Sequence, residues 1–183
     1  MNDRLKKIFQ QSISDNNIPN ELYQQHNVKK GLRNENKTGV LVGLTRICDV
    51  VGYEMVNGQK VDCDGQLFYR GISIFDLINH KSLKLGSFEE ICYLLMFGKL
   101  PTKKQYELFT QELRSMYELP EGFTEVNILR YPSYNIMNKI QRALLMLYSD
   151  DPKAEDTSVE NTLAQGLNIL AKLPAIIVYS YYG

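Results

Sequence analysis

The chain has 183 residues with 21 basic and 21 acidic side chains, so it carries no formal net charge at pH 7. This balance argues against nucleic-acid binding and against attachment to an acidic membrane surface, since both need an excess of lysine and arginine. An apolar content of 44% and three widely spaced cysteines, Cys48, Cys63 and Cys92, predict a reduced, cytoplasmic globular chain without disulfides or structural zinc.

Residues 1–30 are predicted to form a polar, partly helical N-terminal extension. Apolar side chains recur weakly at Leu5 and Ile8, and Pro19 breaks the pattern. The first residues are charged and polar, so this start does not resemble a secretory signal peptide.

Residues 31–72 are predicted to form loops and a small antiparallel β element. Asn57-Gly58 lies between two apolar pairs, which is a strong signal for a two-residue hairpin turn. Asp64-Gly65 predicts a second turn, and the two turns together predict three short strands.

Residues 73–183 are predicted to be helical. Three serine or threonine residues are each followed three residues later by Glu or Gln, as in a helix-capping box: Ser87 with Glu90, Thr102 with Gln105, and Thr157 with Glu160. Gly98 is suited to end the first of these helices. A further helix is expected after Ser133, with Met137 among its inward residues. The fold class is therefore mainly α with a small antiparallel β element near the N-terminus.

The last predicted helix is apolar on nearly all sides beyond Pro174. Such a helix needs cover on most of its surface. The sequence therefore predicts either that the chain is a piece of a longer protein or that it has an obligate partner. The apolar stretch 173–182 is too short to cross a bilayer, so we expect no membrane partner.

The chain offers few side chains with an evident catalytic role. His26 and His80 lie in polar loop contexts and share no spacing with a carboxylate that would indicate a dyad or a metal site. Neither a phosphate-binding glycine loop nor a nucleophile elbow is present. The small basic group of Lys29, Lys30 and Arg33 is a solvated loop by charge alone. We predict no metal site, and these residues by themselves favour an interaction module.

Five short motifs in the same order nevertheless resemble the front part of the citrate synthase family. The likeness covers residues 31–183. Its motifs are Gly31-Leu32-Arg33, the strand at 38–41, the [FY]-R-G signature within 67–71, the L-L-x-x-G-x-x-P-T break at 94–102, and the [AS]-K-[LM]-P run at 171–174. One departure is Asn135-Ile136-Met137, where many members carry H-P-M.

The resemblance implies a citrate-synthase-like helical domain and an enzyme that condenses acetyl-CoA with oxaloacetate and water to give citrate and CoA at the entry to the tricarboxylic acid cycle. It implies no permanently bound cofactor, with acetyl-CoA as a substrate. The family's catalytic His and Asp residues match positions beyond Gly183, so this chain is expected to have no catalytic residue and to be inactive alone. Arg33 falls where a family arginine contacts the CoA phosphates.

The resemblance also implies a homodimer formed through helices 134–149 and 158–183. Two alternatives remain open. A 2-methylcitrate synthase would share the fold and differ in acyl-CoA pocket residues beyond the chain. A non-catalytic helical dimerisation module would keep only the interface helices.

Overall fold

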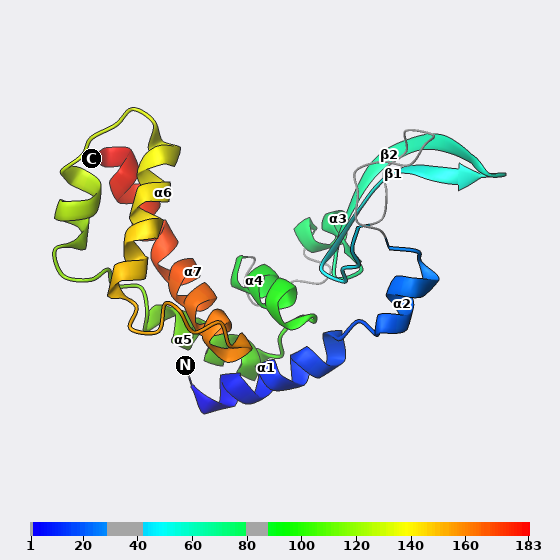
Figure 1. Cartoon of the computed structure of the whole chain (residues 1–183), viewed down its shortest axis with the longest axis horizontal. Coiled ribbons are helices and arrows are strands. Elements are labelled where there is room, and N and C mark those ends of the chain that lie inside the picture. The colour runs from blue at the N-terminus through cyan, green and yellow to red at the C-terminus, as the bar shows by residue number, and fades with distance from the viewer. Residues whose placement is uncertain (1, 29–41, 80–87) are drawn as a thin grey trace. The chain divides into compact units, whose positions relative to one another are not determined.

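The computed structural model describes residues 2–28, 42–79 and 88–183. Helices dominate, together with one three-stranded antiparallel sheet, so the expected mainly helical class is confirmed (Figure 1). The chain divides into two compact units, one formed by Lys7–Tyr106 and the other by Met1–Lys6 with Glu107–Gly183. The earlier division into 1–30, 31–72 and 73–183 remains a prediction.

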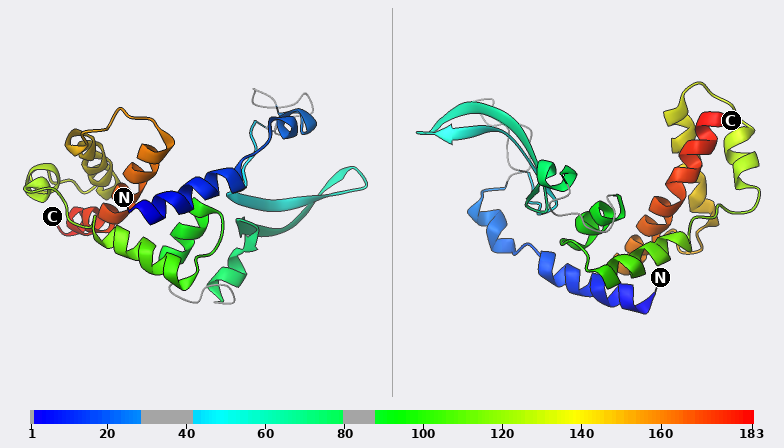
Figure 2. Two further views of the ribbon diagram at one scale, coloured as in Figure 1. Left: turned by 90° about the horizontal axis from the view of Figure 1, so that it is seen from below. Right: turned by 180° about the vertical axis from the view of Figure 1, so that it is seen from behind.

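The sheet belongs to the unit Lys7–Tyr106 and is built on a long hairpin (Figure 2). Strands β1 (Cys48–Val56) and β2 (Gln59–Tyr69) pair antiparallel, and β3 (Ile72–Ser73) adds to β2 in the order β1-β2-β3. Asn57 and Gly58 connect β1 to β2 with φ angles of 51° and 77°. Both residues take the left-handed conformation that a two-residue hairpin turn requires, so the predicted turn is confirmed.

The turn predicted at Asp64-Gly65 is wrong, because β2 runs through both residues. Val51 pairs with Gln66 and Tyr53 pairs with Asp62, so β2 carries extra residues at this point. A bulge accommodates extra residues within a continuing strand, and the turn-favouring pair therefore does not reverse the chain. The reversal comes at Arg70-Gly71, whose φ angles are 51° and 81°.

Among the described residues, the helices that lie wholly or mainly in this unit are α1 (Asp3–Asn16), α2 (Asn20–Gln25), α3 (Ile74–Ile78) and α4 (Phe88–Phe97). Ser73 caps α3, since its Oγ accepts a hydrogen bond from the Phe75 N–H at 3.3 Å. Leu77 of α3 and Leu94 of α4 are almost fully buried in one apolar cluster, and partly buried side chains surround them: Tyr69, Ile72, Ile74, Ile91 and Leu100. This cluster holds the short helices against the end of the hairpin.

The predicted end of α4 is confirmed. Gly98 has a φ of 85°, and its N–H donates to the Leu94 carbonyl at 2.8 Å. The next capping box is also confirmed: the Thr102 N–H donates to Gln105 Oε1 at 2.9 Å, and the Gln105 N–H donates to Thr102 Oγ1 at 3.4 Å. Helix α5 (Lys103–Arg114) follows directly. Ser87, the expected cap of α4, lies outside the described residues.

In the unit that includes Glu107–Gly183, the described regular structure is all helical. A π-helical segment (Thr124–Leu129) is followed by α6 (Ile136–Met146), a 3₁₀ turn (Leu147–Asp150) and α7 (Val159–Tyr182). Helices α6 and α7 lie side by side (Figures 1 and 2). Their shared core consists of Phe123, Ile128, Ala143, Leu147 and Ile176.

Two details of these helices differ from the sequence predictions. Met137 was expected to point inward, yet its side chain is 64% exposed, because Lys139 and Ala143 take the buried face of α6. Helix α7 begins one residue later than the Thr157–Glu160 box predicts. Its cap is Ser158, whose Oγ accepts from the Asn161 N–H at 3.3 Å, and Asp156 in turn accepts from the Ser158 N–H at 2.9 Å.

Helix α7 continues through Pro174 to Tyr182, which makes it 24 residues long. By length and composition α7 as a whole is long and apolar enough to cross a membrane, although residues 173–182 alone are too short. A helix at the core of a water-soluble protein meets the same criteria.

Two glycines with similar backbone angles predict different responses to substitution. A Cβ at Gly58 (φ 77°) would meet nothing within 4 Å, so Gly58→Ala should cost only the left-handed strain, about 1–2 kcal/mol. A Cβ at Gly98 (φ 85°) would lie 2.6 Å from Asn16 Nδ2, so Gly98→Ala should cost about 1 kcal/mol more. Urea unfolding of both variants tests this difference. Equal losses would show that Asn16 is not fixed against Gly98.

Candidate functional site

The sequence-predicted ligand-binding residue, Arg33, lies outside the described residues, as do Lys29, Lys30 and His80. His26 is described and lies exposed at the end of α2. Within the described part of the chain, no group of three or more His, Cys, Asp or Glu side chains has the arrangement of a metal site. The described histidine therefore has no metal-binding constellation around it.

The arginine of the [FY]-R-G motif forms a junction instead of an open site. The Arg70 guanidinium donates to the Leu95 carbonyl through Nη2 at 2.6 Å and Nε at 3.2 Å, and its Nη1 donates to Asn16 Oδ1 at 2.8 Å. The Arg70 N–H donates to the Ile47 carbonyl at 2.9 Å. Burial lowers the pKa of Arg70 from its usual range. This side chain therefore links the end of β2 to α1 and α4.

Asn16 completes the junction from the end of α1. Its Nδ2 donates to the Ser12 carbonyl at 2.7 Å, which leaves Oδ1 to accept from Arg70. The Asn16 amide also packs against Gly98, where any Cβ would collide with it. Two motifs of the resemblance, 67–71 and 94–102, thus meet at one asparagine. Sequence reasoning missed Asn16, since a polar residue at the end of a weakly patterned helix gives no distinguishing signal.

The lysine of the [AS]-K-[LM]-P motif is also structural in this chain. Lys172 is only 9% exposed, and its ammonium donates to the Met116 carbonyl at 3.0 Å and to Asn168 Oδ1 at 2.5 Å. Burial lowers the pKa of Lys172. It borders a hollow of about 390 Å³ together with Asp150, Asp151 and Gln165. Lys172 therefore fastens α7 to the segment that follows α5.

The acidic side chains within residues 150–156 accept hydrogen bonds from neighbouring parts of the chain. Asp151 accepts hydrogen bonds from the Lys153 N–H and from Gln165 Nε2, each at 2.8 Å. The bond from the Ser158 backbone N–H lowers the pKa of Asp156. The predicted role of these acids, a solvated loop that supports the start of the next helix, is consistent with these bonds.

The described cysteines carry free thiols. Burial, together with the nearby Glu89 carboxylate, raises the pKa of Cys92. A raised pKa keeps this sulfur as a thiol near neutral pH, and a thiol is a weak nucleophile.

Comparison with known proteins identifies the family to which this architecture belongs. The family model described as "Citrate synthase, C-terminal domain" matches residues 32–182, which is most of the chain. The chain belongs to the citrate synthase family. The resemblance drawn from the five motifs is confirmed, and with it the synthase class at the level of the family.

Curated relatives and solved structures agree with this membership. The citrate synthase of Saccharolobus solfataricus is 29% identical over 154 residues, covering 84% of this chain and 35% of that protein. The 2-methylcitrate synthase 1 of Corynebacterium glutamicum is 31% identical over 111 residues, covering 61% of this chain and 28% of that protein. The chain therefore spans about a third of the length of the curated relatives it matches.

The citrate synthase structure from Pyrobaculum aerophilum superposes with a TM-score of 0.61 at 25% identity, covering 84% of this chain and 39% of that one. A citrate synthase structure from Thermoplasma acidophilum gives a TM-score of 0.63 at 20% identity over 76% of this chain and 33% of that one, which supports the fold. The citrate-synthase-like helical fold is thus confirmed.

Proposed function

We propose that the protein condenses acetyl-CoA with oxaloacetate and water to give citrate and CoA. The observation that carries this proposal is the family match over residues 32–182, together with the likeness to the Saccharolobus solfataricus citrate synthase over 84% of the chain. In this reaction a proton leaves the acetyl methyl group, the resulting enol carbon bonds to the ketone carbon of oxaloacetate, and water cleaves the thioester to release the CoA thiol.

Residues 1–183 are proposed to contribute fold and assembly to this reaction, without its catalytic side chains. Arg70 and Lys172 each donate hydrogen bonds to backbone carbonyls, so their charged groups have structural roles. His26 lies exposed at the end of α2. Arg33 is the residue we propose to contact the CoA phosphates, since a guanidinium fork suits phosphate oxygens.

A second candidate is the condensation of propionyl-CoA with oxaloacetate to 2-methylcitrate. The likeness to the 2-methylcitrate synthase of Corynebacterium glutamicum, at 31% identity, favours it. The two reactions share the same bond changes and differ by one methyl group on the acyl chain.

Thiol release tests this proposal. The whole gene product is expected to release CoA thiol from acetyl-CoA when oxaloacetate is present, and residues 1–183 alone are expected to give only the background rate. Propionyl-CoA replaces acetyl-CoA in a parallel series, and the larger kcat/KM decides between the two candidates. In the same assay Arg33→Ala should raise the KM for acetyl-CoA more than Arg114→Ala, an exposed control on α5.

No thiol release from either acyl-CoA by a folded whole gene product would contradict the proposed activity. Release by residues 1–183 alone would contradict the proposal that its catalytic groups lie elsewhere. An unchanged KM in Arg33→Ala would remove Arg33 from the CoA site.

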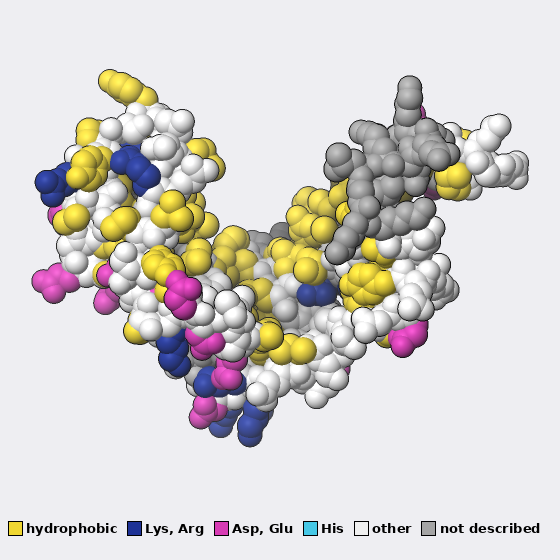
Figure 3. Space-filling view, in the orientation of Figure 1, with side chains coloured by type: hydrophobic (Ala, Val, Ile, Leu, Met, Phe, Trp, Pro, Cys, Tyr) yellow, Lys and Arg dark blue, Asp and Glu magenta, His cyan; other side chains and the backbone are white. Residues whose placement is uncertain are grey.

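We further propose that the chain self-associates through the helices at 134–149 and 158–183. Large apolar side chains on this unit reach its surface (Figure 3), and on α6 and α7 they include Leu145 at 75%, Val178 at 52% and Tyr182 at 83% exposure. A single chain seldom exposes so much apolar area, and a second copy would cover it. This surface also supports the alternative of a dimerisation module.

Sedimentation of the purified chain over a wide concentration range checks this proposal. We expect a dimer that weakens in Leu145→Glu and Val178→Glu, while Lys104→Glu, an exposed change on α5, leaves the mass unaltered. A strictly monomeric mass at every concentration would contradict self-association.

A further inference from the structure

The turn of the β1–β2 hairpin contains a pair of residues that reacts slowly with water. Asn57 and Gly58 form this turn, and both are exposed. Asn57 is also the only asparagine in the 183 residues that is followed by glycine. An asparagine side chain reacts with the backbone nitrogen of the next residue, and glycine favours this reaction because it has no Cβ to obstruct the approach.

The reaction balances as the hydrolysis of one amide. The Gly58 nitrogen loses its proton and bonds to Cγ of Asn57, and the bond from Cγ to the side-chain nitrogen breaks to release ammonia. Water then opens the resulting cyclic imide at either of its two carbonyl carbons. One product is aspartate with an ordinary backbone. The other is isoaspartate, in which the main chain runs through the former side chain.

The surroundings of Gly58 leave room for this reaction, whereas the closed turn opposes it. A Cβ built on Gly58 would meet nothing within 4 Å, so no described atom crowds that side of the residue. The φ angles of 51° at Asn57 and 77° at Gly58 are those of a type I′ turn. Ring closure needs the Asn57 Cγ to reach the next backbone nitrogen, and the main-chain angles of that turn hold the two apart. The hairpin must therefore open before Asn57 reacts.

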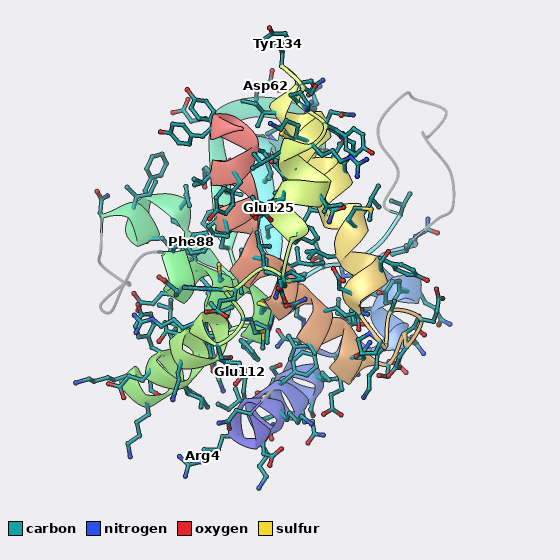
Figure 4. The ribbon with its side chains drawn as sticks, turned by 90° about the vertical axis from the view of Figure 1, so that its left-hand side faces the viewer. Arg4, Asp62, Phe88, Glu112, Glu125 and Tyr134 are labelled. Atoms are coloured by element: carbon teal, nitrogen blue, oxygen red, sulfur yellow. The ribbon has the colours of Figure 1, made fainter. Side chains whose placement is uncertain are left out.

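The ladder that has to open is short. Strand β3 pairs with β2 at Phe68 and Tyr69, so among the described residues the ladder from Tyr53 to Asp62 consists of two strands. Asp62, labelled in Figure 4, lies opposite Tyr53 on β2. The Lys60 ammonium lies 4.5 Å from the centre of the Tyr53 ring and 3.9 Å from the Asp62 carboxylate. A two-stranded hairpin is marginally stable in water, so these few contacts govern how often it opens.

We propose that Asn57 is a site of spontaneous deamidation and that opening of the outer hairpin sets its rate. Isoaspartate adds one methylene to the main chain between Val56 and Gln59, which pair across the turn. Because a two-residue loop fixes the register of a hairpin, the longer main chain disrupts this pairing. The modification therefore loosens the hairpin irreversibly. It takes no part in the proposed condensation and does not depend on that activity.

Peptide mapping of the whole gene product, incubated at mildly alkaline pH and cut with trypsin, tests the site. The fragment 47–60 contains one asparagine, Asn57, and the fragment 115–130 contains one asparagine, Asn127, which precedes Ile128. We expect the mass gain of an amide-to-acid conversion in 47–60 and none in 115–130 over the same time. Enzymatic methylation of isoaspartate should label 47–60. Asn57→Gln keeps an amide on a longer side chain and should abolish both signals.

A second variant tests the role of hairpin opening. Tyr53→Ala removes the ring beside Lys60, and since such cross-strand contacts contribute modestly to a ladder, deamidation should become faster by a factor of about 2–5. Tyr131→Ala is the matched control: Tyr131 is 54% exposed, against 51% for Tyr53, and its ring lies 5.7 Å from the Arg130 guanidinium. It should leave the rate unchanged. The chain unfolded in urea should react fastest, and amide exchange in α4 and α6 checks that both variants remain folded.

Two kinds of result would overturn the proposal. A mass gain in 47–60 that is no faster than in 115–130, or that persists in Asn57→Gln, would show that Asn57 is not the site. An equal rate in the folded and the urea-unfolded chain, or an unchanged rate in folded Tyr53→Ala, would show that opening of the hairpin does not control the reaction.

Discussion

The hydrogen bonds of the Arg70 side chain are the interactions on which the unit Lys7–Tyr106 depends most. One guanidinium closes the end of the hairpin against the Leu95 carbonyl of α4 and the Asn16 side chain of α1. The last carbonyls of a helix have no partner within that helix, and a cation beside them is favourable for both hydrogen bonding and the helix dipole. Partial burial strengthens these bonds, and loss of the side chain would leave two acceptors, the Leu95 carbonyl and Asn16 Oδ1, without their donor.

The same junction explains why the family can be read from this stretch of sequence. Arg70 of the motif at 67–71 and Leu95 of the motif at 94–102 are 25 residues apart in the sequence. The Arg70 guanidinium nevertheless donates directly to the Leu95 carbonyl. Gly98 belongs to the same contact, because only a residue without a Cβ fits against Asn16. Lys172 plays a comparable part in the other unit. Arg70, Gly98 and Lys172, which belong to three of the five motifs, therefore build the fold.

Local signals in the sequence predicted several elements correctly, because short-range chemistry fixes them. The Asn57-Gly58 turn, the Gly98 helix end and the Thr102–Gln105 box each depend on a few neighbouring residues. Errors arose where the partner is distant or where two local signals compete. Asp64-Gly65 lies at a bulge inside β2, Ser158 and not Thr157 caps α7, and Lys139 is buried on α6 where Met137 was expected. Arg33 lies outside the described residues, so its role remains a proposal.

The most direct test of this account is hydrogen exchange and urea unfolding of Arg70→Ala, with Arg114→Ala as the exposed control. The account predicts a loss of about 2 kcal/mol or more in the free energy of unfolding. It also predicts faster amide exchange at the ends of β2, α1 and α4, with little change in α6 and α7. A loss no greater than that of Arg114→Ala, with unchanged exchange in those three elements, would contradict the claim that Arg70 holds this unit together.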